Sequence, residues 1–171
     1  MVDKIALEEH FLCPGFEDYW KTTVDNVDPA IYRQVMSSLR DFGEHRLGEM
    51  DKAGIERAVL SLAGPGVQIE TGTATACRKA KECNDFLAKE IQRRPDRYSG
   101  FGHVPLQDPA VAADELERCV RELGFCGIMI NGHSNGEEPN LPVAQHLGPS
   151  VIDHAERARR GRAARGLRRT I

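Results

Sequence analysis

The chain has 171 residues, of which 40% are hydrophobic and 29% charged, and its formal net charge is −3. This length and composition are typical of one soluble globular domain with a sizeable core. No apolar run approaches the roughly 18 residues of a membrane span, and the N-terminus lacks the apolar segment of a signal peptide. The five cysteines form no CxxC pair and are odd in number, which favours a reducing compartment over a disulfide framework. We therefore expect a cytoplasmic protein that does not contact membranes.

The charges are divided unevenly along the chain. Residues 155–171 carry seven arginines and one glutamate, whereas residues 1–154 carry 16 basic and 25 acidic side chains. An arginine-rich tail can bind nucleic acid or an acidic surface. No recognisable nucleic-acid-binding fold precedes this tail, however, so nucleic acid is not the expected partner.

The first predicted strand, residues 4–10, runs from apolar into ionisable residues. Residues 5–7 are apolar and suit a buried core, and Glu8, Glu9 and His10 follow them directly. Side chains alternate along a strand, so Glu8 and His10 should share one face and Glu9 the other. Zn²⁺ accepts carboxylate and imidazole ligands, which makes Glu8 and His10 half of a candidate metal site. The alternative is a strand that simply ends in polar surface residues.

The remaining elements alternate between helices and strands. A long loop is predicted over residues 11–28, and apolar residues at helical spacing then run from Pro29 to a stop at Gly54. Further helices are predicted at 73–94 and 109–123, and strands at 57–62, 98–104 and 125–130. The last strand is nearly all apolar, which suits burial on both faces. This order predicts an α/β fold with a parallel sheet and right-handed crossovers.

Each predicted strand ends in polar residues, and the carboxyl ends of parallel strands are where chemistry is usually found. Besides Glu8 and His10, these ends carry Ser61, His103 and Asn131. Ser61 lacks the Gly-x-Ser-x-Gly elbow, so it is not proposed as a nucleophile. For His103 a core or supporting role is favoured over a role as metal ligand.

Short motifs along the chain resemble one known family. In chain order they are residues 5–11, 46–56, 60–62, 84–85, 94–97, 105–109 and 123–125, with 131–132 beyond. Together they resemble the metal-dependent decarboxylases of the amidohydrolase superfamily, and within it the γ-resorcylate (2,6-dihydroxybenzoate) decarboxylases. The motifs occur in the family's order at similar spacing, over about residues 4 to 135.

The resemblance implies a distorted TIM barrel with a divalent metal, usually Zn²⁺, at its C-terminal rim. It maps two metal ligands onto Glu8 and His10 and implies two more, a His and an Asp, in the second half of the barrel. The reaction implied is the non-oxidative loss of CO₂ from a hydroxylated benzoate, with the metal holding the carboxylate and the ortho-hydroxyl. A general acid from the second half would protonate the ring. Asn131 could hydrogen-bond a phenolic oxygen of this small aromatic substrate or serve only as a turn, and the full-length form is expected to be a homo-oligomer.

The chain departs from the family in its length. A TIM barrel usually needs about 250 residues and eight strands, whereas about four βα units are recognised here. We therefore interpret residues 1–154 as the N-terminal half of the barrel, and residues 155–171 as an irregular Arg/Ala/Gly-rich tail that is not native to the fold. This interpretation makes the polypeptide a truncated or frame-shifted, inactive decarboxylase. The alternatives are a superfamily hydrolase of C–N or C–O bonds, and a non-catalytic interaction protein that uses the basic tail.

Overall fold

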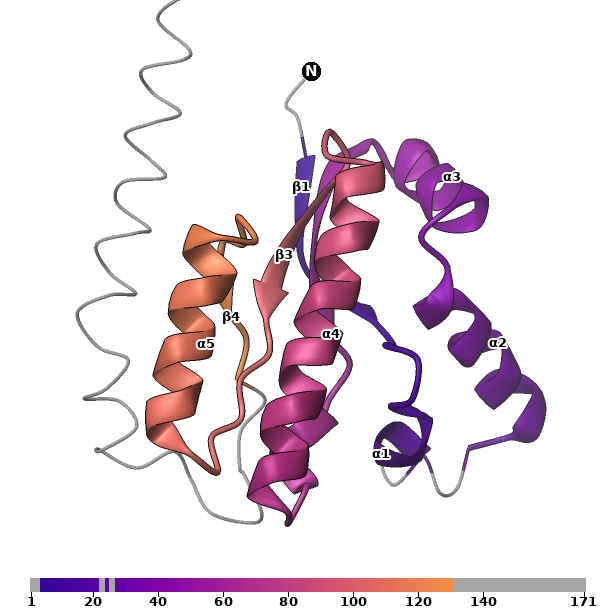
Figure 1. Ribbon diagram of the computed structural model, residues 1–171. Coiled ribbons are helices and arrows are strands. Elements are labelled where there is room, and N and C mark those ends of the chain that lie inside the picture. Colours follow the sequence, from indigo (N-terminus) through magenta and orange to yellow (C-terminus); the bar gives the residue numbers. More distant parts are fainter. Residues whose placement is uncertain (1–3, 22–23, 25–26, 131–171) are drawn as a thin grey trace, which may run out of the picture.

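The computed structural model describes residues 4–21, 24 and 27–130, which form an α/β fold (Figure 1). Its helices are α1 (Glu17–Lys21), α2 (Pro29–Arg40), α3 (Glu44–Ala53), α4 (Thr73–Arg93) and α5 (Pro109–Arg121). Its strands are β1 (Lys4–Phe11), β2 (Ile55–Leu62), β3 (Tyr98–Gly102) and β4 (Gly127–Ile128), and a 3₁₀ turn, η1, spans Gly66–Ile69. All neighbouring strands are parallel, in the order β1-β2-β3-β4. The predicted parallel α/β arrangement is therefore confirmed for the described residues.

Local sequence signals explain where the helices begin and end. Asp28 and Asp108 cap α2 and α5, because the carboxylate of each accepts backbone N–H groups of the first helical turn. In both helices a proline occupies the first position, where a missing N–H costs nothing. Gly54 ends α3 with a φ of 65°, a left-handed conformation that glycine adopts without steric cost.

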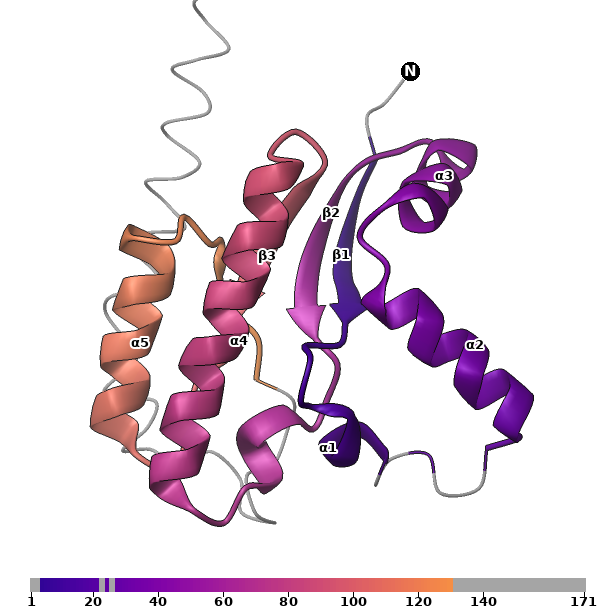
Figure 2. The same cartoon turned by 45° about the vertical axis from the view of Figure 1, so that its right-hand side comes forward.

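The core packs the sheet against α4 and α5 and extends to α2 and α3, which contribute the buried Met36 and Met50. Helix α4 buries one stripe, formed by Ala76, Ala80, Cys83 and Leu87. Figures 1 and 2 show α4 and α5 side by side, whereas α2 and α3 lie toward the β1 side of the sheet. A β-carbon added at Gly100 of β3 would lie 2.8 Å from Cδ1 of Ile91, so this glycine permits the close approach of α4 to the sheet.

A buried polar cluster joins α4, α5 and the end of β3. The Asn84 side chain accepts a hydrogen bond from the His103 backbone N–H (2.8 Å) and donates to the His103 carbonyl (2.9 Å). It also donates to Glu115 (2.7 Å), which in turn forms an ion pair with Arg118. Arg118 contacts Asp85 as well, and these hydrogen bonds raise its pKa. The cluster therefore fixes His103 between the two helices.

The expectation that residues 5–7 lie in a core is wrong for two of them. Ile5 is 56% and Leu7 65% exposed. Strand β1 is the outer strand of the described sheet, so one of its edges has no neighbour among the described residues. An apolar run predicts burial only where another element covers it, and no described element covers these two side chains.

Two further expectations need correction. The segment predicted as an uninterrupted loop contains α1, a short helix with Glu17 and Asp18 in its first turn and Lys21 in its last. This charge order favours a helix, because it complements the helix dipole. The strand predicted over residues 125–130 has only two ladder residues. Both are half-buried and not buried on both faces as predicted, and β4 is the other outer strand of the described sheet.

Two predicted features, Asn131 and the tail over residues 155–171, lie outside the described residues, so the structure places neither. Among the described helices, none is both long and apolar enough to cross a membrane.

Candidate metal centre

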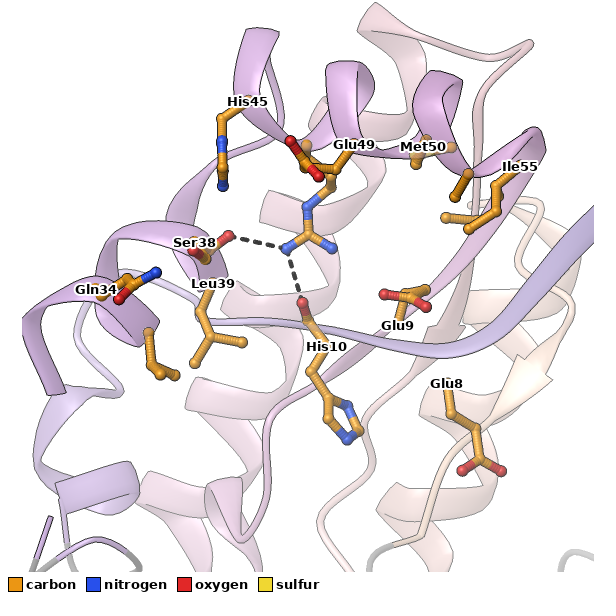
Figure 3. A pocket seen from close by; sticks show the side chains of 14 residues that line it. Glu8, Glu9, His10, Gln34, Ser38, Leu39, His45, Glu49, Met50 and Ile55 are labelled. Atoms are coloured by element: carbon orange, nitrogen blue, oxygen red, sulfur yellow. Dashed lines mark hydrogen bonds between the residues drawn. The ribbon is translucent and has the colours of Figure 1, made fainter. Parts of the chain in front are cut away.

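A bulge in β1 sets the direction of Glu8. Ala6 pairs with Ala58 and Glu9 pairs with Leu60, so two residues of β1 stand opposite one residue of β2. Within the described ranges Glu8 is the one non-glycine residue with a positive φ, at 59°. Figure 3 shows the side chains of Glu8 and His10 on one side of β1 and that of Glu9 on the other. Both Glu8 and His10 are exposed to solvent.

His10 is held through both its side chain and its backbone. Its Nδ1 lies 3.0 Å from Oγ of Ser61, which is fully buried on the neighbouring strand. Its carbonyl accepts a hydrogen bond from Nη2 of Arg46 at 2.8 Å, one of the two dashed lines in Figure 3. Because these contacts occupy Nδ1 and the carbonyl, Nε2 is the imidazole nitrogen that remains for a ligand.

Arg46 reaches this position from α3. The same Nη2 contacts the carbonyl of Ser38 in α2 (3.1 Å), and Nε donates to the carbonyl of Asp41 (2.7 Å). Burial lowers the pKa of this guanidinium, while Tyr98, Glu9 and Asp41 raise it. Because its guanidinium donates hydrogen bonds to three backbone carbonyls, Arg46 holds α2, α3 and β1 together.

A cavity of about 650 Å³ lies between α2, α3 and β1 (Figure 3). Its apolar wall includes Val35, Leu39, Met50 and Ile55, and its polar lining includes Gln34, His45 and Glu49. The backbone that carries Glu8 and His10 forms one of its sides. Nothing in the sequence pattern predicted this cavity, because it arises from how two helices lie against an outer strand.

His103 is placed in the core, as the sequence interpretation favoured. It is 3% exposed, and its Nε2 accepts a hydrogen bond from the Val67 backbone N–H at 3.0 Å. Burial lowers its pKa to about 4, so the imidazole is neutral near pH 7. With Nε2 occupied, His103 supports the η1 turn and does not extend the Glu8–His10 pair.

The described residues therefore supply two candidate ligands. Among them, no group of three or more His, Cys, Asp or Glu side chains could hold a metal ion. A carboxylate and an imidazole suit a divalent cation, although stable protein sites use three or four protein ligands. Ser61 and Arg46 are the supporting residues that the sequence interpretation missed.

Known proteins share this sequence and fold. The family model for amidohydrolases matches residues 19–162. A γ-resorcylate decarboxylase from Polaromonas sp. JS666 is 41% identical over 143 residues, which cover 84% of this chain and 43% of that protein. The chain thus spans about two-fifths of the length of this curated relative.

Two solved structures extend the likeness to the fold. One is a dihydroxybenzoic acid decarboxylase from Polaromonas sp. JS666 with bound manganese and the inhibitor 2-nitroresorcinol. It has a TM-score of 0.71 and 42% identity, over 77% of this chain and 39% of that one. The other is a 5-carboxyvanillate decarboxylase from Novosphingobium aromaticivorans, complexed with manganese and 4-hydroxy-3-methoxy-5-nitrobenzoic acid. It has a TM-score of 0.77 and 34% identity, over 89% of this chain and 48% of that one.

The described sheet with its helices corresponds to the N-terminal part of the TIM barrel of such enzymes, as the motifs predicted. The family model covers most of the sequence, from the first helix onward. The chain belongs to the amidohydrolase family.

Proposed function

We propose that this polypeptide is part of a metal-dependent, non-oxidative decarboxylase of small hydroxylated aromatic acids. The observation that carries the proposal is the Glu8–His10 pair, which projects from one side of β1 in a chain 41% identical to a γ-resorcylate decarboxylase. The residue types of this first-strand pair also favour a decarboxylase over a hydrolase. The superfamily resemblance implies Glu-x-His in the decarboxylases and His-x-His in the hydrolases. The substrate would be a small aromatic carboxylate such as 2,6-dihydroxybenzoate.

Glu8 and His10 suit a divalent metal ion as two of its ligands. Glu8 offers an exposed carboxylate, and His10 offers Nε2 while Ser61 occupies Nδ1. When bound, such a metal would supply Lewis-acid chemistry and a template for the substrate carboxylate and phenolic oxygen. We propose Zn²⁺ on the basis of this donor pair, and Mn²⁺ is the competing ion because it is bound in both related structures.

The other roles lie outside the described residues. Asn131 is proposed to hydrogen-bond a phenolic oxygen of the substrate. Two further ligands and the general acid are proposed to come from the second half of the barrel, with residues 1–154 forming the first half and residues 155–171 taking no part in it. We accordingly expect the 171-residue polypeptide to show no measurable turnover, and the complete protein to be a homo-oligomer.

The decarboxylase proposal is tested by supplying the missing half. Residues 1–130 are fused to the part of the Polaromonas γ-resorcylate decarboxylase that aligns beyond residue 130 of this chain, so that no segment of the barrel is left out. Loss of 2,6-dihydroxybenzoate absorbance and release of CO₂ are measured with Zn²⁺ or Mn²⁺ added. We expect turnover by the fusion and none by the 171-residue chain.

Variants of the fusion assign the residues. Glu8→Ala and His10→Ala should each reduce turnover by about 10² or more, because each removes a metal ligand. Glu56→Ala is the matched control, since this exposed carboxylate lies at the start of β2. A cooperatively folded fusion that hydrolyses amides or lactones and leaves 2,6-dihydroxybenzoate intact would support the hydrolase alternative instead. Turnover by the 171-residue chain itself would overturn the half-barrel proposal.

A further inference from the structure

We infer that Ser61 is a positioning residue that fixes the tautomer of His10, with the proton on Nδ1 and the lone pair on Nε2. This inference rests on the proposed function, since it concerns the nitrogen that would face the metal. It assigns a role to a buried hydroxyl that has no part in catalysis as a nucleophile.

The strand register brings the two residues together. His10 stands directly opposite Ser61 in the parallel β1–β2 ladder, and their side chains meet with 3.0 Å between Nδ1 and Oγ. Ser61 has no exposed surface, whereas His10 is exposed. The hydroxyl therefore holds the imidazole from the core side and leaves its opposite edge toward solvent.

The chemistry of imidazole decides which of the two donates. If Oγ donated to Nδ1, the ring proton would lie on Nε2, and no lone pair would remain on the open edge. If Nδ1–H donates to Oγ, Nε2 presents its lone pair outward. Metal-bound histidines nearly always donate their other ring N–H to a protein acceptor, and the hydroxyl oxygen of Ser61 is placed to be that acceptor.

Arg46 limits the alternatives by fixing the backbone. Its bond to the His10 carbonyl, together with its bonds to Ser38 and Asp41, restrains the main chain from which the imidazole projects. Side-chain rotation is then the freedom that remains, and the Ser61 contact removes it. The two residues thus have separate tasks, with Arg46 setting the place of His10 and Ser61 setting its ring orientation and proton.

The first test reads the tautomer directly in the metal-free 171-residue chain. ¹⁵N-histidine-labelled protein is studied by magic-angle-spinning NMR, which does not require a monomer, and His10→Asn identifies the signals of His10. We expect the Nδ1–H tautomer in the unsubstituted chain and in Ser61→Thr, which keeps the hydroxyl. Ser61→Ala should shift His10 toward the Nε2–H form that free imidazole side chains prefer. Ser99→Ala, which removes a hydroxyl from the adjacent strand β3, should leave the tautomer unchanged.

The second test measures metal affinity by competition of Zn²⁺ or Mn²⁺ with a chromophoric chelator. Loss of such a supporting contact typically weakens metal binding by about 10- to 100-fold, so we expect this loss in Ser61→Ala and no change in Ser99→Ala. An Nε2–H tautomer in the unsubstituted chain, or an identical tautomer and affinity in Ser61→Ala, would overturn the inference. If the double variant Glu8→Ala, His10→Ala bound metal as well as the unsubstituted chain, the proposed metal site would be overturned. The tautomer measurement needs no metal, so it tests the inference about Ser61 separately.

Discussion

The buried side chain of His103 helps to hold the conformation of the neighbouring η1 turn. Its neutral imidazole accepts the Val67 N–H, and Gln107 donates to the carbonyls of Val67 and Glu70 on the same turn. Gly66 lies so close that an added β-carbon would be 2.6 Å from the His103 Nε2. The turn therefore depends on an unprotonated imidazole, because a protonated Nε2 could not accept the Val67 N–H.

We expect acid to destabilise the fold through this residue. The pKa of His103 is about 4 in the folded chain, against about 6.5 when unfolded. Between these values the unfolded state binds more protons, so stability is fully present above about pH 6.5 and is lost as the pH falls toward about 4, by about 3 kcal/mol in total. Urea unfolding at pH 7.5 and pH 5 measures this loss. His103→Gln should flatten the pH dependence, whereas the exposed His45→Gln should retain it. Equal pH dependence in all three proteins would contradict the assignment.

At the scale of elements, Asn84 connects the end of β3 to two helices. Its amide satisfies both backbone groups of His103 and one oxygen of Glu115. All three residues are at most 8% exposed, so no water readily replaces the amide. Removing a buried partner costs more than the bond itself contributes, because the remaining groups stay unsatisfied.

Asn84→Ala should therefore lower the free energy of unfolding by about 2–4 kcal/mol. Gln92→Ala removes an amide from an exposed position of the same helix and should change stability by less than about 0.5 kcal/mol. Urea denaturation followed by circular dichroism compares the two variants. Similar midpoints for both would show that the cluster contributes little to stability.

Helix positions were largely predictable because their signals are local. Asp28-Pro29, Asp108-Pro109 and Gly54 act on residues within one turn, and the structure uses all three as caps. The length of β4 and the burial of Ile5 were not predictable, since both depend on which elements lie beside the strand. A local pattern cannot report the neighbours of an outer strand.

In the candidate site, too, features set by local sequence were predictable and features set by neighbouring strands were not. Strand alternation predicted a shared side for Glu8 and His10, and Figure 3 shows them on one side, although Glu8 itself lies in the bulge and its direction is set there and not by regular alternation. The Ser61–His10 contact depends on the register of two strands that are 51 residues apart in the chain. The motifs of one sequence carry no information about that register, which is why Ser61 was considered only as a nucleophile.

At the scale of the whole molecule, β1 leaves an apolar surface uncovered. Ile5 and Leu7 project from it with 56% and 65% of their surfaces exposed, and one edge of the strand has no described partner. Unpaired strand edges with apolar side chains are prone to pair with another chain. We expect the 171-residue polypeptide to self-associate at micromolar concentration.

Size-exclusion chromatography with light scattering tests this expectation. Ile5→Lys together with Leu7→Lys should shift the distribution toward the monomer, because charges disfavour edge pairing. Val111→Lys on α5, where the side chain is 37% exposed, is the matched control and should not. A monomer with a sharp cooperative melting transition before any substitution would contradict the expectation and would show that these residues need no cover.

The backbone of Glu8 carries one more consequence, because its proposed role as a metal ligand and the stability of the fold make opposite demands on this position. A glutamate with φ at 59° occupies a conformation that glycine adopts freely and that costs other residues about 1–3 kcal/mol. Glu8→Gly should therefore make the chain more resistant to urea, by about 1 kcal/mol, and under the proposed function it should also weaken metal binding. Glu9→Gly, at a position without positive φ, should make the chain less resistant, and equal losses in both variants would argue against strain at Glu8. Glycine would be the more stable residue at this position, so the carboxylate of Glu8 comes at a cost in stability that its proposed role as a metal ligand would explain.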